Sequence, residues 1–404
     1  MIILKENPTI EKRIIDHKKG KFRGPTLVFF AGIHGNEQAG VKALKNVLPQ
    51  LNEHNIYGEV YGIYGNINAI QQNKRYIDND LNRIWTTNLL NQLKDKENYT
   101  NEEKEQIAIY ELISDILSNT TEPTYFIDFH TTSSKTLPFI TINDALINRK
   151  FSRHFPVPIV LGVEEYLEGP LLSYLNKRGF VSLGFEAGQH IDKQAIYNCE
   201  AFIRLTFYLS GLLKEEAQDY NKYYKQLQSA SKKRTDIYEV VYKYDIKEEE
   251  DFKMKSGFES FQPIKKGILL ATSNDIPIHA PSSHELFMPL YQERGNDGFF
   301  IIKKTPRFFL LLSSILRKFR ADRLLTLLPG IKWHDKSKGV LRANLKITRF
   351  LAKSIFHLLG YRNKQEDKTH LLLYNRERVS RNDMYKDLDW YKSKKRRLLD
   401  VFFL

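Results

Sequence analysis

The chain has 404 residues, 42% of them hydrophobic and 27% charged, so it can bury a large core and form two or three domains. Its single cysteine, Cys199, excludes an intramolecular disulfide and a cysteine-rich metal site. The sequence starts without a signal-peptide pattern, and no later stretch reaches about eighteen uninterrupted apolar residues. These features predict a cytoplasmic protein, soluble or peripheral at a membrane, and they are compatible with a homo-oligomer.

The net charge of +14 is concentrated at one end of the chain. Residues 306–404 contain 24 Lys and Arg against 9 Asp and Glu, a net charge of +15, which leaves −1 for residues 1–305. A uniformly basic enzyme would indicate a polyanionic substrate. A neutral body with a basic terminal segment indicates instead that this segment has its own partner or location.

The first half of the chain alternates short apolar runs with amphipathic patterns, which is typical of an α/β domain with a parallel or mixed sheet. The runs predicted as strands are residues 13–17, 26–33, 59–64, 125–129, 139–142 and 181–186. Apolar residues recur at helical spacing in residues 38–51, 102–117 and 193–213. We therefore predict a catalytic domain over residues 1–214 and a polar connector over residues 215–236.

Residues 237–305 show short β-like runs separated by glycine and proline, which predicts a small β-rich domain. Residues 306–404 follow as a basic C-terminal extension that we expect to be mainly helical. Its apolar block, residues 308–316, is too short to span a bilayer. A helix of this composition suits an anionic membrane surface, or it packs on the parent domain. Nucleic-acid binding is a third alternative, and it ranks below the membrane because the aromatic residues are interleaved with leucines.

Two apolar runs each end at a histidine. His34 and Glu37 follow residues 26–30 in the stretch Gly-Ile-His-Gly-Asn-Glu, and His130 follows residues 125–129. His-x-x-Glu at a strand end can place a nitrogen and an oxygen on one cation. Alone it is more often a surface turn, but a second strand-end histidine completes the two-His, one-carboxylate set of zinc hydrolases, with a position left open for water.

Two further stretches add chemistry to this set. Arg75, Asn82 and Arg83 lie within nine residues, and guanidinium forks bind carboxylates in a bidentate manner. The alternative for these arginines is a salt-bridge network with the neighbouring aspartates. Glu186 ends the apolar run 181–186 between glycines, where a carboxylate is costly unless it handles a cation or a proton. It is suited to act as a general base, and the alternative is that it caps the helix beginning near Asp192.

In chain order, four motifs resemble the succinylglutamate desuccinylase/aspartoacylase family, a branch of the zinc-carboxypeptidase-like hydrolases. They are HGNE, N-x-x-A with RY-x-D-x-DLNR, D-x-H-T-T and E-x-G. The resemblance covers roughly residues 10 to 305, the β-rich segment included. It implies an α/β fold with a zinc-carboxypeptidase-like mixed central sheet flanked by helices and a small β-rich second domain.

The resemblance also implies roles for the residues of these motifs. One zinc ion per chain would be bound by His34, Glu37 and His130. Glu186 would be the catalytic base, and Arg75 would polarise the scissile carbonyl.

On the substrate side, the resemblance implies that Asn82 and Arg83 hold a substrate carboxylate and that Tyr291 reaches into the active site from the β-rich segment. Aspartoacylases carry a tyrosine and an arginine on the segment before the catalytic glutamate, where this chain has Leu172 and Asn176. Acetylaspartate and succinylglutamate therefore do not follow as substrates.

The leading hypothesis is a zinc-dependent amide hydrolase that removes an acyl group from an N-acyl amino acid or a related small, carboxylate-bearing amide. Glu186 would assist the attack of zinc-bound water. The alternative is a metallocarboxypeptidase acting on a peptide C-terminus, since the same zinc site and arginine clamp suit it. A non-catalytic binding protein is a third hypothesis, disfavoured by the presence of Glu186.

Overall fold

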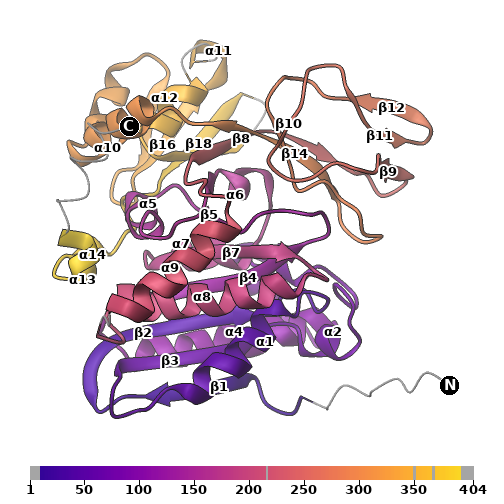
Figure 1. The fold of residues 1–404 in the computed structure, drawn as a ribbon. Helices are drawn as coiled ribbons and strands as arrows, with labels where there is room; N and C mark the ends of the chain where they lie inside the picture. The colour runs from indigo at the N-terminus through magenta and orange to yellow at the C-terminus, as the bar shows by residue number, and fades with distance from the viewer. Residues whose placement is uncertain (1–9, 215–216, 349–351, 366–368, 393–404) are drawn as a thin grey trace.

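The computed structural model describes residues 10–214, 217–348, 352–365 and 369–392, and within them the chain is organised around one mixed sheet of eleven strands (Figure 1). The strand order is β1-β3-β2-β4-β7-β5-β6-β8-β14-β13-β10. These strands are β1 (Ile14–Lys19), β2 (Phe22–Ala31), β3 (Tyr57–Tyr64), β4 (Thr124–Thr132), β5 (Phe139–Ile142), β6 (Ile159–Leu161), β7 (Val181–Gln189), β8 (Ile237–Asp245), β10 (Gln262–Pro263), β13 (Glu285–Phe287) and β14 (Asp297–Lys304).

The centre of this sheet is parallel, because β3, β2, β4 and β7 run in the same direction. All nine residues of β4 are buried. Alternate side chains of β2 enter two separate cores: Leu27 and Phe29 face one, Val28 and Phe30 the other. Strands buried on both faces read as continuous apolar runs, which is why these four were predicted correctly from the sequence.

Helices cover both faces of the sheet. One face carries α1 (Ala39–Val47), α8 (Lys193–Ser210) and α9 (Ala217–Ala230), and the other carries α4 (Asn101–Ser118) and α7 (Leu171–Asn176). The remaining helical segments of this part are α2 (Ile67–Gln71), α3 (Thr87–Gln92), α5 (Leu146–Ser152), α6 (Val163–Tyr166), η1 (Leu48–Gln50), η2 (Leu81–Arg83) and η3 (Leu93–Asp95). Helix α9 thus lies within the predicted connector and packs on α8.

The β-rich segment extends the main sheet. Strand β8 pairs in parallel with β6, and β14 pairs antiparallel with β8. A separate sheet of three strands, in the order β12-β11-β9, is formed by β9 (Phe252–Met254), β11 (Leu269–Ser273) and β12 (Ile276–His279). Residues 237–305 were expected to form a small domain of their own, but four of their strands belong to the sheet of the first domain. Local patterns identify strands without showing which sheet they join.

The C-terminal extension contains a four-stranded antiparallel sheet in the order β15-β16-β18-β17. The strands are β15 (Ile331–Asp335), β16 (Val340–Asn344), β17 (Tyr361–Gln365) and β18 (His370–Asn375). The helical segments are α10 (Arg307–Lys318), η4 (Ala321–Leu327), α11 (Leu345–Thr348), α12 (Ala352–Leu358), α13 (Asn382–Tyr385) and α14 (Asp389–Lys392). Describing the extension as mainly helical therefore missed this sheet. Residues 393–404 of the predicted extension lie outside the described residues.

The strands of the extension were hard to predict because they bury little. Leu341, Ala343 and Leu373 enter a small core of their own. However, β15 and β16 have only five residues each, so their alternation of buried and more exposed positions is too short to stand out in the sequence. None of the helices in the described part of the chain is long and apolar enough to cross a bilayer.

A buried ion-pair network joins the extension to the catalytic domain. Arg317 of α10 has a fully buried side chain, and its Nη2 lies 2.6 Å from Asp144 Oδ2. Burial alone would raise the pKa of Asp144, but Arg149 and Arg317 outweigh burial and lower it. Arg317 also donates from Nη1 to Glu377 Oε1 at 3.2 Å. The extension therefore packs on the parent domain, which was one of the alternatives considered from the sequence.

A second contact joins the extension to α6. Arg376 is buried, and its Nη2 lies 3.0 Å from Glu164 Oε1 and 2.6 Å from Glu165 Oε1. Near the end of the described chain, Trp390 donates from its indole nitrogen to the hydroxyl of Tyr125 at 2.9 Å. The extension thus contacts both the central sheet and the segment after β6.

Replacing Arg317 with methionine should destabilise the protein by about 3 to 5 kcal/mol, because it removes the cationic partner of Glu377 and one of the two arginines that pair with the buried Asp144. Urea unfolding measures this. Arg323→Met is the matched control, since Arg323 is exposed on the following turn, and it should change the unfolding free energy by less than about 0.5 kcal/mol. Equal stability of the two variants would show that the network does not hold the extension.

Candidate active site

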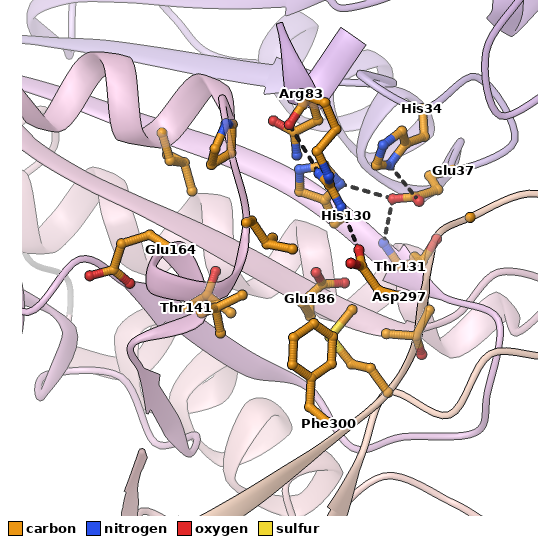
Figure 2. Close-up of a pocket in the computed structure, with 18 of the residues that line it drawn as sticks. His34, Glu37, Arg83, His130, Thr131, Thr141, Glu164, Glu186, Asp297 and Phe300 are labelled. Atoms are coloured by element: carbon orange, nitrogen blue, oxygen red, sulfur yellow. Dashed lines mark hydrogen bonds and ion pairs between the residues drawn. The ribbon is translucent and has the colours of Figure 1, made fainter. Parts of the chain in front are cut away.

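A pocket opens at the carboxyl ends of β2, β4 and β7, and it encloses about 1080 Å³ of space, its open mouth included (Figure 2). The carboxyl ends of parallel strands are the usual place for ligand sites in α/β sheets. Other walls come from η2, from residues 163–176 and from residues 288–300 of the β-rich segment. The pocket is therefore shared between the two parts of the chain.

His34, Glu37 and His130 form a buried group whose ligand atoms all lie within 4.8 Å of one another. Nδ1 of His34 lies 2.8 Å from Glu37 Oε1, and Nδ1 of His130 lies 3.0 Å from Glu37 Oε2. Gly32 follows the last residue of β2 with φ = +75°, and a Cβ on Gly35 would lie 2.1 Å from the carbonyl carbon of Ala69. The glycines therefore permit the tight turn that brings His34 and Glu37 to the strand end.

An aspartate contacts the Nε2 atom of each of the two histidines, on the side of the ring away from Glu37. Nε2 of His34 lies 3.1 Å from Asp80 Oδ1, and Nε2 of His130 lies 2.7 Å from Asp128 Oδ2. Metal-binding histidines typically have one nitrogen held by a carboxylate in this way, which orients the ring and raises its basicity. We did not predict this role for either aspartate. Asp128 could have been found, because residues two apart on a strand point to the same face.

The electrostatics of the group favour a cation. Burial would raise the pKa of Glu37, but His34 and His130 outweigh it and hold this pKa well below its usual value. Burial would lower the pKa of His130, but Asp128 and Glu37 raise it well above its usual value. The two imidazoles are thus surrounded by the carboxylates of Glu37, Asp80 and Asp128, which favour a positive charge at this place. The donor set of His34, Glu37 and His130 is that of catalytic zinc sites, and the residues present fit a zinc ion.

Arg75 lies beside the group of His34, Glu37 and His130. Its buried guanidinium donates to Glu37 Oε1 at 3.2 Å and to Asp80 Oδ2 at 3.3 Å, and it lines the pocket. The salt bridge with an aspartate, which was the alternative for the arginines, therefore exists. Arg75 nevertheless lines the pocket while it makes this salt bridge.

Glu186 lies next to His130, because the two residues are register partners on the parallel strands β4 and β7. Its carboxylate is buried, and one oxygen, Oε2, has no hydrogen-bond partner among the described residues. Burial, with smaller contributions from Glu37 and Asp128, raises the pKa of Glu186 to about 8. Helix α8 is capped by Asp192, whose side chain accepts from Gln194 N at 2.8 Å, so the capping alternative for Glu186 is wrong.

Asn82 and Arg83 also line the pocket. Asn82 accepts a hydrogen bond on Oδ1 from the backbone N–H of Leu171 at 2.9 Å, and this bond does not use its side-chain NH2 group. Arg83 donates from Nη2 to Asp297 Oδ2 at 2.6 Å, and Asp297 in turn accepts from Lys243 at 2.9 Å (Figure 2). Asp297 lies far along the chain from Arg83, and no sequence signal pointed to this pair.

The structure does not bring Tyr291 into the pocket. Its hydroxyl donates to the carbonyl of Lys255 at 2.8 Å and accepts from the backbone of Phe258 at 3.0 Å. The next residue, Gln292, lines the pocket instead, and its Oε1 lies 3.2 Å from Nε2 of His190. His190 follows the end of β7, where the strand-end pattern could have identified it. Residues 291 and 292 lie in a loop, so the sequence does not fix which of the two side chains faces the cavity.

The pocket wall on α7 agrees with the expected departure from aspartoacylases. Leu172 and Asn176 both line the pocket, and Asn176 Oδ1 accepts from Asn148 at 2.9 Å. The wall on α7 therefore combines Leu172 with the polar Ser173 and Asn176, and α7 contributes no arginine to the lining.

Comparisons with known proteins agree on one family. Residues 23–189 match the family model described as the succinylglutamate desuccinylase/aspartoacylase catalytic domain. The chain is 40% identical to a succinylglutamate desuccinylase of Photorhabdus laumondii subsp. laumondii over 81 residues, which is 20% of this chain and 24% of that protein. It is 31% identical to a probable aspartoacylase of Prochlorococcus marinus over 147 residues, 34% of this chain and 45% of that protein. Both alignments span less than half the length of these curated relatives.

Solved structures share the fold. A succinylglutamate desuccinylase/aspartoacylase structure from Rhodobacter sphaeroides has a TM-score of 0.55 at 16% identity, covering 72% of this chain and 88% of that one. A succinylglutamate desuccinylase structure from Vibrio parahaemolyticus has a TM-score of 0.51 at 15% identity, covering 71% of this chain and 83% of that one. This likeness establishes the mixed α/β architecture, and the family model identifies the segment that carries the site. Residues 23–189, which carry His34, Glu37, His130 and Glu186, are therefore similar to the catalytic domain of the succinylglutamate desuccinylase/aspartoacylase family.

Proposed function

We propose that this protein is a zinc-dependent amide hydrolase that removes an acyl group from an N-acyl amino acid or a related small amide. The observation that carries the proposal is the placement of Glu186 beside the buried group of His34, Glu37 and His130 in one pocket. A general base next to a potential two-His, one-carboxylate zinc site is the arrangement that metal-assisted hydrolysis requires.

The two histidines, through Nδ1, and the Glu37 carboxylate would hold the ion. When bound, zinc supplies Lewis-acid chemistry that makes water a nucleophile at neutral pH. Glu186 takes a proton from the attacking water and passes it to the leaving amine as the amide C–N bond breaks, so the hydroxyl group remains on the acyl carbon. Its raised pKa suits a group that must accept and then return a proton. The Arg75 guanidinium stabilises the negative charge that develops on the carbonyl oxygen.

Substrate size separates this proposal from the carboxypeptidase alternative. The loop of residues 288–297 lines the pocket and is tied to the catalytic domain on two sides. Asn36 donates to Gln292 at 3.1 Å, and Arg294 donates to the carbonyl of Tyr76 at 2.7 Å. A loop fixed over the pocket favours a small amide over a peptide. Hydrolysis of a panel of N-acyl amino acids and short peptides by the zinc-loaded protein tests this, and cleavage of peptides alone would favour the alternative.

Glu186→Gln should lower turnover by at least about a hundredfold, because the amide cannot accept the proton, while the protein still binds one zinc per chain. Steady-state hydrolysis and metal analysis of the same preparation check both parts. Glu111→Gln, an exposed change on α4, is the control and should retain full activity. Retained turnover in metal-replete Glu186→Gln protein would remove this residue from the mechanism.

Asp128→Asn should weaken zinc binding by about 10- to 100-fold, because it removes the charge behind His130 while keeping the shape of the side chain. Competition with a chromogenic chelator measures the affinity. Asp383→Asn changes a fully exposed aspartate and should leave the affinity unchanged. If both variants bind zinc equally, the metal is not held by His130.

Asp297→Asn should lower KM for N-acyl amino acids by about tenfold, because it frees the Arg83 guanidinium for the substrate carboxylate. The corresponding amides without a carboxylate should show no change. Asp245→Asn is a closely matched control, since Asp245 pairs with the same Lys243 but not with Arg83. An equal effect on charged and neutral substrates would show that Arg83 does not bind the carboxylate.

A further inference from the structure

Helix α10 and the turn after it expose a set of large apolar side chains to solvent. We call this set the apolar ridge, and its members are Phe308, Phe309, Leu311, Ile315, Phe319, Leu324 and Leu327, with exposed fractions from 44% to 79%. Soluble surfaces carry single apolar residues as a rule, whereas contiguous apolar patches mark contact sites. Figure 1 places α10 at the edge of the extension, on the side away from β9, β11 and β12.

The ridge lies opposite the face by which α10 is attached. Leu310, Ser313 and Arg317 are buried and hold the helix on the parent domain. Successive residues of a helix are rotated by about 100°, which places Phe308, Leu311, Ile315 and Phe319 in a stripe about 180° from the buried face. The described residues therefore cover the face of α10 that carries Leu310, Ser313 and Arg317, and they leave the opposite, apolar face exposed.

Within residues 307–327, the exposed charged side chains are all positive. Arg307, Lys318, Arg320 and Arg323 are all exposed. The one acidic residue within positions 307–327, Asp322, is buried and accepts a hydrogen bond from the Tyr361 hydroxyl at 3.0 Å. Exposed apolar side chains flanked by cations suit an interface of anionic head groups and acyl chains. A second copy of this chain would bring like charges together, so the charge pattern disfavours self-association through this surface.

We propose that the apolar ridge docks this protein on an anionic membrane surface, with α10 lying in the plane of the interface. The buried Arg317 network fixes the helix to the body, so the ridge contacts lipid as a preformed surface. Residues 307–327 are absent from the lining of the pocket described above, so the ridge and the pocket are formed by different residues.

Co-sedimentation of the full-length protein with vesicles tests this inference. Wild-type protein should pellet with phosphatidylcholine vesicles that contain roughly 30% phosphatidylglycerol, and far less with phosphatidylcholine alone. The double variant Phe308→Glu and Phe319→Glu should lower binding to the anionic vesicles by at least about tenfold, because both changes remove apolar area and add charge to the ridge. Circular dichroism of each variant verifies that it is folded.

The matched control is the double variant Phe22→Glu and Ile276→Glu, which changes exposed apolar residues elsewhere by the same net charge and should bind like wild type. Equal pelleting of the ridge variant and wild type would overturn the proposal, as would absence of wild-type binding to anionic vesicles. Light scattering would also overturn it if wild type is an oligomer that the ridge variant dissociates, since a second copy would then cover the ridge.

Discussion

The candidate site depends on one buried carboxylate, Glu37. It lies within hydrogen-bond distance of His34 and His130, accepts from Arg75, and accepts from the backbone of Thr131 at 3.0 Å. Removing a charge from water is expensive unless cationic or hydrogen-bonding partners surround it. The ends of β2 and β4 and the loop carrying Arg75 must therefore converge on this point. The same convergence creates a place for a divalent cation.

The sequence predicted the centre of the site because its residues share one local signal, an apolar strand that ends at a polar side chain. His34, His130 and Glu186 all carry it, and parallel strands bring such ends to one edge. Contacts between residues far apart in the sequence have no such local pattern. Asp297 reaches Arg83 through the pairing of β14 with β8, and the sheet of the extension buries too few residues to impose a clear period. The prediction that Tyr291 reaches into the pocket was wrong for a related reason, since a position in a loop does not fix the direction of a side chain.

The extension takes part in the architecture of the pocket. The match to the family model ends at residue 189, yet Arg376 from the extension binds Glu164 and Glu165 on α6. Val163 and Glu164 line the pocket, so one wall rests on residues far beyond the matched segment. The basic residues of the extension are thus of two kinds. Buried arginines such as Arg317 and Arg376 pair with carboxylates of the catalytic domain, and exposed cations lie in the same segment as the apolar ridge.

The register pairing of His130 with Glu186 has a consequence for how such a pocket can evolve. Their relative position is fixed by backbone hydrogen bonds between β4 and β7, and a slip of one residue would turn a side chain to the opposite face of the sheet. The pocket walls on α7 and on residues 288–297 lie outside this pairing. Mutation can therefore reshape these walls while the relative position of His130 and Glu186 stays in place.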